Sequence, residues 1–419
     1  MNPHHPAEAA TPPCPHFGLC GGCRLQDLAY STQLARKAAR LRQLLAAFTL
    51  PELQLHPSPP LAYRNRIRLT LRTIDGRLRA GYLSRPATEP GAPFMEQSDM
   101  SGESSLRPQF VPITQCPIAA PLLWRAAEAF LALANNTPWL LSSQLAPDQL
   151  ELFTDAGESK LLLTLFLRTA QKNPPARIAA DFTALCESLR VQIPQLAGAG
   201  IALLPPAARS RRIEQPRPGP SWGSPGLSYT LEPRTPNLEP LTYWVPRGAF
   251  FQVNRFLLPE LVTTVTSAPT GDTALAWDLY AGIGLFSRAL FSRALAHNFA
   301  QVTAVEIAEP AATALAQTKL TNLRAVKATT LDFLRAELLQ RERPSLVVLD
   351  PPRSGAGTEV CERLTRIAAP TLIYISCSPD ALARDLAALS GYSVAELHLF
   401  DLFPQTTHIE TVAVLTRSQ

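Results

Sequence analysis

Three cysteines near the start of the chain have the spacing of a metal-binding loop. Cys14, Cys20 and Cys23 form a Cys-x5-Cys-x2-Cys pattern, and the two glycines before Cys23 allow the chain to turn tightly. Three thiolates need a fourth partner, and Cys116, which precedes a proline, is the nearest candidate. Four thiolates fit either zinc or an iron–sulfur cluster. Radical chemistry is less favoured, because its Cys-x3-Cys-x2-Cys spacing is absent.

Two further residues have the surroundings of a nucleophile and a base. Cys377 ends an apolar segment and is followed by Ser378 and Pro379, which predict the start of a helix. A helix N-terminus favours the thiolate of a nearby cysteine, so Cys377 is a candidate nucleophile. Glu410 opens the last apolar strand and is a candidate general base. The alternatives are a buried apolar cysteine and a solvent-facing glutamate.

A glycine-containing segment predicts a nucleotide-like cofactor. Residues 278–284 read DLYAGIG, and Glu306 follows Gly282 by 24 residues, where an acid can accept hydrogen bonds from a ribose diol. The third glycine of the dinucleotide fingerprint is missing, which favours S-adenosylmethionine over a pyrophosphate-bearing dinucleotide. The alternative for Glu306 is a solvated strand end.

The DPPR tetrapeptide at residues 350–353 predicts a second strand end at the same site. Its two prolines cannot continue a strand, so they direct the chain out at the carboxyl edge, where ligands bind in open α/β sheets. Asp350 is therefore expected near cofactor and substrate. As a simple turn the tetrapeptide would have no function.

The elements that must position these residues alternate from residue 275 onward. Apolar strands are expected at residues 274–280, 301–306, 346–350, 372–377 and 412–415, and helices at residues 286–297, 310–320, 331–339, 358–368 and 380–389. This alternation is typical of βαβ units around a parallel sheet, and therefore of the α/β class.

The first half of the chain has a different pattern. A helix is expected at residues 27–48, and residues 63–83 alternate as a hairpin around Asp75-Gly76, with Arg64, Arg66, Arg68 and Arg72 on one face. Flexible or surface loops are expected at residues 86–108 and 209–226. Between them, helices at residues 121–134 and 177–189 and a strand at residues 161–167 indicate an α+β unit.

Composition excludes some classes of protein. No run approaches the roughly 18 apolar residues of a membrane span, and no secretory signal is visible at the N-terminus, so we expect a cytoplasmic protein without disulfides. The net charge is +5, and 34 of the 39 basic residues are arginine. An arginine excess suits a polyanionic partner, although a coding bias explains it equally well.

Six motifs are far more specific together than apart. They are, in order, CPHFGLCGGC at residues 14–23, FFQVN at 250–254, DLYAGIG at 278–284, DPPR at 350–353, SCSP at 376–379 and HIE at 408–410. This combination resembles the bacterial RNA uracil-5 methyltransferases, the family that acts on ribosomal RNA and on the T-loop of transfer RNA. The similarity covers essentially the whole chain from Cys14 and is strongest after Phe250.

The resemblance implies roles for individual residues. Cys377 would be the nucleophile and Glu410 the base. A [4Fe-4S] cluster, a feature of the ribosomal branch, would be held by Cys14, Cys20, Cys23 and Cys116. S-adenosylmethionine would be contacted by Gln252, Tyr280, Glu306, Asp332 and Asp350. Two features depart from the family pattern: Leu285 stands where members often have Asn, and only 13 residues precede Cys14, where many ribosomal members have an oligonucleotide-binding barrel.

The resemblance also implies the domain organisation. We expect a disordered lead-in (residues 1–13), a cluster loop and helix (14–48), a central α+β RNA-binding domain (49–245) and a class I, Rossmann-like methyltransferase domain (246–419). The expected activity is methyl transfer from S-adenosylmethionine to carbon 5 of a uridine in 23S ribosomal RNA, through a covalent cysteine–uracil intermediate, by a monomer. The alternatives are a transfer-RNA uridine-5 methyltransferase and a catalytically idle RNA-binding protein of the same fold. A cytosine-5 enzyme is disfavoured, because its Thr-Cys pair and second cysteine are not evident.

Overall fold

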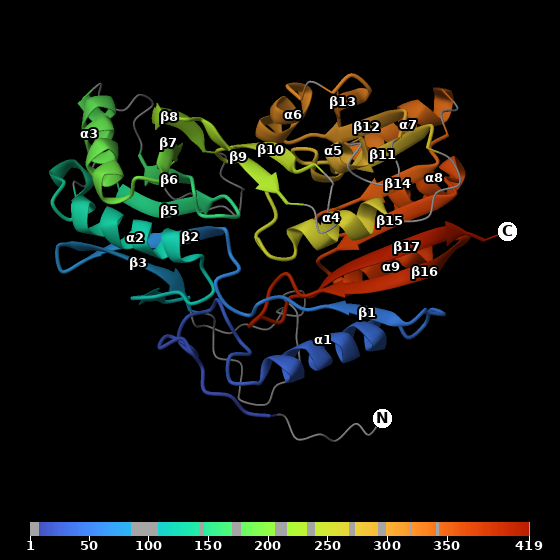
Figure 1. The fold of residues 1–419 in the computed structure, drawn as a ribbon, viewed down its shortest axis with the longest axis horizontal. Coiled ribbons are helices and arrows are strands. Elements are labelled where there is room, and N and C mark those ends of the chain that lie inside the picture. The colour runs from blue at the N-terminus through green and yellow to red at the C-terminus, as the bar shows by residue number, and fades with distance from the viewer. Residues whose placement is uncertain are drawn as a thin grey trace. The chain divides into compact units, whose positions relative to one another are not determined.

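The computed structural model describes residues 8–84, 108–141, 146–169, 177–205, 216–232, 239–267, 273–291, 299–318, 320–340 and 343–418 (Figure 1). The chain forms two compact units, each built from separate stretches of sequence. Unit 1 comprises Met1–Tyr30, Pro60–Leu227 and Gln405–Thr407, and unit 2 comprises Ser31–Pro59, Ser228–Pro404 and His408–Gln419. Among the described residues, no helix has the length and apolar character needed to cross a membrane.

Unit 1 contains a seven-stranded sheet with the order β4-β3-β2-β5-β6-β7-β8. All neighbouring strands are antiparallel except β6 and β7, which are parallel and are connected through α3. The elements are β2 (Arg66–Ile74), β3 (Arg77–Leu83), β4 (Phe110–Pro112), α2 (Pro121–Ala134), η1 (Pro138–Leu141), β5 (Ala146–Thr154), β6 (Leu161–Arg168), α3 (Arg177–Gln192), β7 (Leu196–Leu204) and β8 (Arg217–Gly223).

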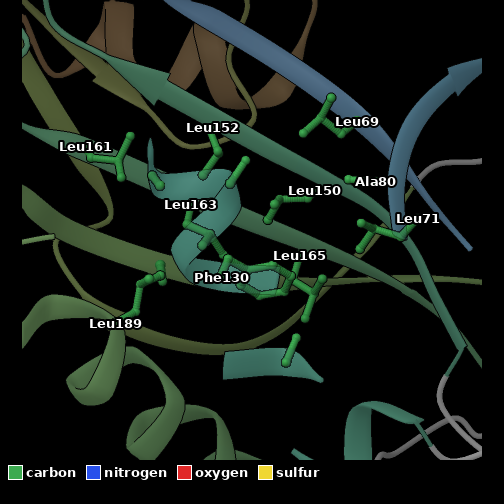
Figure 2. Close-up of a cluster of buried hydrophobic side chains, with 14 of the residues drawn as sticks. Leu69, Leu71, Ala80, Phe130, Leu150, Leu152, Leu161, Leu163, Leu165 and Leu189 are labelled. Carbon is green, nitrogen blue, oxygen red and sulfur yellow. The ribbon is translucent and has the colours of Figure 1, made fainter. Parts of the chain in front are cut away.

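The core of unit 1 lies between one face of this sheet and helices α2 and α3. Alternate residues of β2, such as Leu69 and Leu71, are buried there together with Phe130 of α2 and Leu189 of α3 (Figure 2). Asp75 and Gly76 both have positive φ, which is the geometry of the two-residue turn expected for the β2–β3 hairpin. The predicted hairpin is therefore confirmed.

Unit 2 contains an eight-stranded sheet with the order β1-β16-β17-β15-β14-β11-β12-β13. Strands β13, β12, β11, β14 and β15 are parallel to one another, whereas β17 is antiparallel to both β15 and β16. The strands are β1 (Leu53–His56), β11 (Leu275–Leu279), β12 (Gln301–Glu306), β13 (Leu323–Lys327), β14 (Leu346–Leu349), β15 (Thr371–Ser376), β16 (Tyr392–Phe400) and β17 (Glu410–Arg417), with a separate pair of β9 (Gly226–Leu231) and β10 (Leu241–Pro246).

Helices cover both faces of this sheet, as a mainly parallel sheet requires (Figure 1). One apolar core joins one face of the sheet to α1 (Tyr30–Leu44), α7 (Thr330–Gln340), α8 (Thr358–Ile367) and α9 (Pro379–Ala388). The remaining helices of unit 2 are α4 (Leu258–Thr266), α5 (Leu285–Phe291) and α6 (Glu309–Ala316). Strands β14 and β15 are buried along their whole length, which explains their continuous apolar sequence.

Several sequence-based expectations need correction. The predicted surface loop at 209–226 contains β8, a proline-bearing edge strand that pairs with β7. Of the predicted lead-in, residues 8–10 pair with residues 27–29. Helix α1 is shorter than residues 27–48 and belongs to unit 2, where its apolar face packs on the sheet. Most of the loop at 86–108 and the second half of the helix at 286–297 lie outside the described residues.

Candidate active site

Four strands of unit 2 end at one edge of the sheet, and each contributes a polar residue there. Strands β11, β12, β14 and β15 run parallel, so their carboxyl ends share this edge. Asp278, Glu306, Asp350 and Cys377 lie at or directly after these ends. Chain connections turn in opposite directions on either side of β11, which makes this the switch point at which open α/β sheets bind ligands.

The turn after β11 is held by Glu306. The backbone N–H of Gly282 donates to Glu306 Oε2 at 2.8 Å, while Oε1 accepts from the N–H groups of Ile307 and Ala308. Tyr280, Gly282 and Gly284 have positive φ, so the chain turns sharply away from the strand. The acid predicted to bind a ribose therefore also shapes the glycine turn that a cofactor would contact.

Two aspartates interact at the ends of the adjacent strands β11 and β14: Asp278 is buried and Asp350 is partly buried. Burial raises the pKa of Asp278 to about 7, against the lowering effect of hydrogen bonds from Ser287. Burial also raises the pKa of Asp350 to about 7; the charge of Asp278 adds to this rise, and a hydrogen bond from the Gln252 amide opposes it. The FFQVN segment and the DPPR motif thus meet through Gln252 and Asp350, and Asp278 is a site residue to which the motifs assigned no role.

Cys377 and Glu410 interact across the ends of β15 and β17. Burial raises the pKa of Cys377 to about 11, and the negative charges of Glu410 and Asp350 also raise it, while the guanidinium of Arg353 lowers it. Glu410 is buried, which raises the pKa of its carboxyl well above the usual range; Asp350 adds to this rise and Arg353 opposes it. Burial therefore opposes the stabilisation of the Cys377 thiolate that is expected from the helix N-terminus.

Arg353 provides the cation of this group. Its Nη2 atom lies 3.3 Å from Nδ1 of His408, and the His408 ring packs edge-on against Phe403 with 5.6 Å between ring centroids. Arg353 is exposed, whereas Glu410 is buried. In the sequence Arg353 stood out only as part of the DPPR motif, which indicated no role for its side chain.

Two other predicted cofactor residues lie in or near α7. Tyr280 forms a side-chain hydrogen bond with Thr330 at the start of that helix. Asp332 is exposed; its carboxylate accepts from Thr329 Oγ1 at 2.7 Å and pairs with Arg335 at 3.3 Å. Both interactions are local to the helix start. At position 285, where the family often has Asn, Leu285 is buried and its carbonyl accepts a hydrogen bond from Tyr243.

The four predicted cluster cysteines line one pocket in unit 1. Cys14, Cys20, Cys23 and Cys116 are all half-buried there, and burial raises the pKa of Cys23 to about 12 and that of Cys116 to about 11. The charge of Arg64, which lines the same pocket, opposes both rises. Within the part of the chain that the structure describes, no three His, Cys, Asp or Glu side chains converge tightly enough to hold one metal ion.

The predicted basic face of the hairpin is partly neutralised. Arg66 and Arg68 pair with Glu151, and Arg72 lies 3.5 Å from Asp148. Arg64 does not lie on this face, because it precedes β2 and faces the cysteine pocket. Arg68 and Arg72 stay about half-exposed despite these ion pairs, and Arg77 and Arg79 near the turn are also exposed.

Comparison with known proteins shows similarity to one family of RNA methyltransferases. A family model described as tRNA (Uracil-5-)-methyltransferase matches residues 237–418. The 23S rRNA (uracil(747)-C(5))-methyltransferase of Yersinia pseudotuberculosis is 28% identical over 95% of this chain and 97% of its own length. The 23S rRNA (uracil(1939)-C(5))-methyltransferase of Chromohalobacter salexigens is 28% identical over 98% of this chain and 77% of its own length. The C-terminal 182 residues are thus similar to the tRNA (Uracil-5-)-methyltransferase family, and the two relatives are similar to this chain over nearly its whole length.

A solved structure has the same fold as this chain. The Pyrococcus abyssi tRNA (uracil-54, C5)-methyltransferase, determined in complex with S-adenosyl-L-homocysteine, superposes with a TM-score of 0.65 at 21% identity, over 95% of this chain and 86% of that one. The α/β fold expected from the motifs is confirmed, and the family model and the relatives agree with the expected family and enzyme class. The roles of individual residues stay predictions.

Proposed function

We propose that this methyltransferase transfers a methyl group from S-adenosylmethionine to carbon 5 of a uridine in 23S ribosomal RNA, through a covalent bond between Cys377 and the base. The observation that carries the proposal is that Cys377, Glu410 and Asp350 interact at the sheet edge where β11, β12, β14 and β15 end. A cytoplasmic monomer is part of the proposal. The names of the two relatives support ribosomal RNA as substrate.

The chemistry requires a nucleophile, because carbon 5 of uracil is too weak a nucleophile on its own. The sulfur of Cys377 adds to carbon 6, and the electron pair moves to give an enolate whose carbon 5 attacks the sulfonium methyl group; S-adenosylhomocysteine leaves as the carbon–sulfur bond breaks. Glu410 then takes the carbon 5 proton, the double bond re-forms, and the thiolate of Cys377 is expelled from carbon 6. The uracil must leave its stack to reach Cys377.

Arg353 supports the charged forms that this scheme needs. A thiol with a pKa of about 11 is protonated at neutral pH, and a buried carboxyl beside Asp350 also favours its proton. The guanidinium of Arg353 lowers the pKa of both groups, so it favours the thiolate before attack and the carboxylate before proton removal. We assign it to the active site for this reason.

We propose that acidic residues at the strand ends bind the cofactor. Glu306 suits the ribose diol, while Asp350, held by Gln252, suits the positively charged end of S-adenosylmethionine. Tyr280 lies between these two positions in the glycine turn. Asp332, whose exposed carboxylate lies in the first turn of α7, is the remaining proposed cofactor residue.

The pocket of unit 1 supports a [4Fe-4S] cluster as the second cofactor. Its donor set is four thiols from two distant stretches of sequence, which fits ligation by four cysteines. A single zinc ion needs four sulfurs at about 2.3 Å from one point. In the cluster each thiolate binds its own iron, which suits side chains that line a pocket without converging. Arg64 would offset the negative charge of the cysteines.

The proposed RNA contact in unit 1 is the turn end of the hairpin. Arg72 and Arg79 are opposite each other on β2 and β3, and Arg77 lies beside the turn; all three are exposed. Arg77 and Arg79 can neutralise backbone phosphates, whereas Arg72 already pairs with Asp148.

Two variants test the covalent scheme. Cys377→Ala should abolish methyl transfer while S-adenosylhomocysteine still binds, and Glu410→Gln should accumulate a protein–RNA adduct on a denaturing gel. Retained activity of Cys377→Ala would eliminate the scheme. Mapping of 5-methyluridine by mass spectrometry in a deletion strain decides the substrate: loss from 23S ribosomal RNA supports the proposal, whereas loss from transfer RNA would give the enzyme the substrate class named for the Pyrococcus protein.

A further inference from the structure

A lysine and an aspartate form an ion pair deep inside unit 2, away from the reacting groups. The ammonium of Lys37, on α1, lies 2.6 Å from Asp401 Oδ1, and both side chains are 0% exposed. Lys37 also donates to the carbonyl oxygen of Phe403 at 3.0 Å. Burying both charges costs more than packing an apolar pair of similar volume would, so stability alone does not account for this arrangement.

Asn254 holds the same stretch of chain from the other direction. Its Nδ2 atom donates to the carbonyl oxygen of Leu402 at 3.1 Å and to Ser58 Oγ at 2.9 Å. Its Oδ1 atom accepts from the backbone N–H groups of Phe256 and Leu257. Both amide atoms are therefore used, and Asn254 is fully buried.

These contacts converge on the connection between β16 and β17. Asp401, Leu402 and Phe403 follow the last residue of β16, and Glu410 is the first residue of β17, opposite Phe400 in the antiparallel register. Lys37 and Asn254 thus hold the carboxylate of Asp401 and the next two carbonyl oxygens of this irregular segment. Asn254 also lies two residues after Gln252, whose amide reaches Asp350, so one short segment contacts both Asp350 and the connection that precedes Glu410.

We propose that Lys37 and Asn254 are positioning residues for Glu410: by fixing residues 401–403 they place the carboxyl that removes the carbon 5 proton. This inference rests on the proposed covalent mechanism. Neither residue touches the substrate. Their loss should therefore slow the last step, proton removal and release of Cys377, more than it slows methyl transfer.

The test measures the covalent adduct during turnover, with 23S ribosomal RNA from a strain lacking the enzyme and tritiated S-adenosylmethionine. The double variant Lys37→Met/Asp401→Asn removes both charges, so no buried charge is left without a partner. Asn254→Ser keeps a side-chain oxygen that can cap Phe256 and Leu257 but is too short to reach Leu402. The control is Arg36→Met, the same kind of change at the exposed neighbouring position of α1.

We expect both test variants to bind S-adenosylhomocysteine like the wild type and to raise the steady-state adduct about tenfold over Arg36→Met. If they fold and bind S-adenosylhomocysteine but show no more adduct than the control, while Glu410→Gln does accumulate it, the inference is wrong. Loss of methyl transfer without adduct also overturns it, because the nucleophile or cofactor would then be the part displaced. If the wild type methylates the RNA but Glu410→Gln forms no adduct, the proposed mechanism fails instead.

Discussion

The carboxylate of Glu306 accepts a hydrogen bond from the backbone N–H of Gly282 at 2.8 Å, and this contact ties the end of β12 to the turn after β11. Because the other carboxylate oxygen accepts from Ile307 and Ala308, Glu306 orders two turns at once. An acid in this position can bind the cofactor and also hold the surface against which the cofactor lies.

Glu306→Ala should therefore weaken S-adenosylhomocysteine binding strongly. Hydrogen bonds to a charged group contribute about 1.5–3 kcal/mol each, so we expect roughly a ten- to hundredfold rise in Kd, measured by isothermal titration calorimetry. Glu306→Gln retains one acceptor oxygen and should lose less. Equal affinity of Glu306→Ala and the wild type would contradict both roles.

The thiol of Cys377 should react slowly at neutral pH. With a pKa of about 11, its thiolate fraction rises about tenfold per pH unit, so alkylation of the Cys377 peptide by iodoacetamide should keep rising from pH 7 to pH 9. Arg353→Met should slow alkylation at each pH, because the cation that lowers the pKa is gone, and Arg353→Lys should restore much of the rate. A plateau below pH 9 in the wild type would show that the thiolate is stabilised instead.

Asp278 and Asp350 should make stability depend on pH in an unusual direction. Their pKa values rise from 3.8 to about 7 on folding, so the folded state holds more protons than the unfolded state within this window. Stability is then fully present below pH 4 and falls as pH rises to about 7, by at most about 1.4 kcal/mol per pH unit for each carboxyl. Urea unfolding of the cofactor-free protein measures this slope, and Asp350→Asn, which still accepts from Gln252, should reduce it. An unchanged slope would exclude Asp350 as its source.

A glycine after the DPPR motif lies against a buried carboxylate. Gly355 has a φ of +83°, and a Cβ there would lie 2.5 Å from Asp385 Oδ2, the atom that accepts from the N–H of Ala356. Gly357 has a similar φ of +86° but no atom within 4 Å of a Cβ. Gly355→Ala should therefore lower the melting temperature clearly more than Gly357→Ala, since both carry the backbone cost of about 1 kcal/mol and only the first clashes. Equal losses would mean that Asp385 moves freely.

The sequence predicted the strands that carry chemistry better than the strands that complete the sheet. The strand at 301–306 and the helix at 121–134 have the predicted bounds, because apolar periodicity and flanking turn residues coincide there. Strands β1, β13 and β16 were not predicted: β13 is short and mostly exposed, and β16 alternates weakly over its first half. Their pairing is decided by the neighbouring strands of the folded sheet.

The motifs of the candidate site were predictable from the sequence, but the contacts between buried side chains that support them were not. Cys377, Glu410 and Asp350 stand at strand ends, which the sequence marks with prolines and apolar runs. The role of Lys37 has no such mark, because a lysine in an amphipathic helix is normally exposed. Only the packing of α1 shows that its ammonium faces Asp401.

The pocket of unit 1 gives a last prediction about the metal. If Cys14, Cys20, Cys23 and Cys116 hold a [4Fe-4S] cluster, anaerobically purified protein should contain about four irons per chain and show broad visible absorption that dithionite bleaches. Cys23→Ser should lose most of this iron and absorption. Cys186→Ala is the control, because Cys186 is buried in the apolar core of the same unit and does not line the pocket. One zinc per chain without visible absorption would mean that the four cysteines bind zinc and not a cluster. Equal iron in Cys23→Ser and Cys186→Ala would mean that Cys23 is not a ligand.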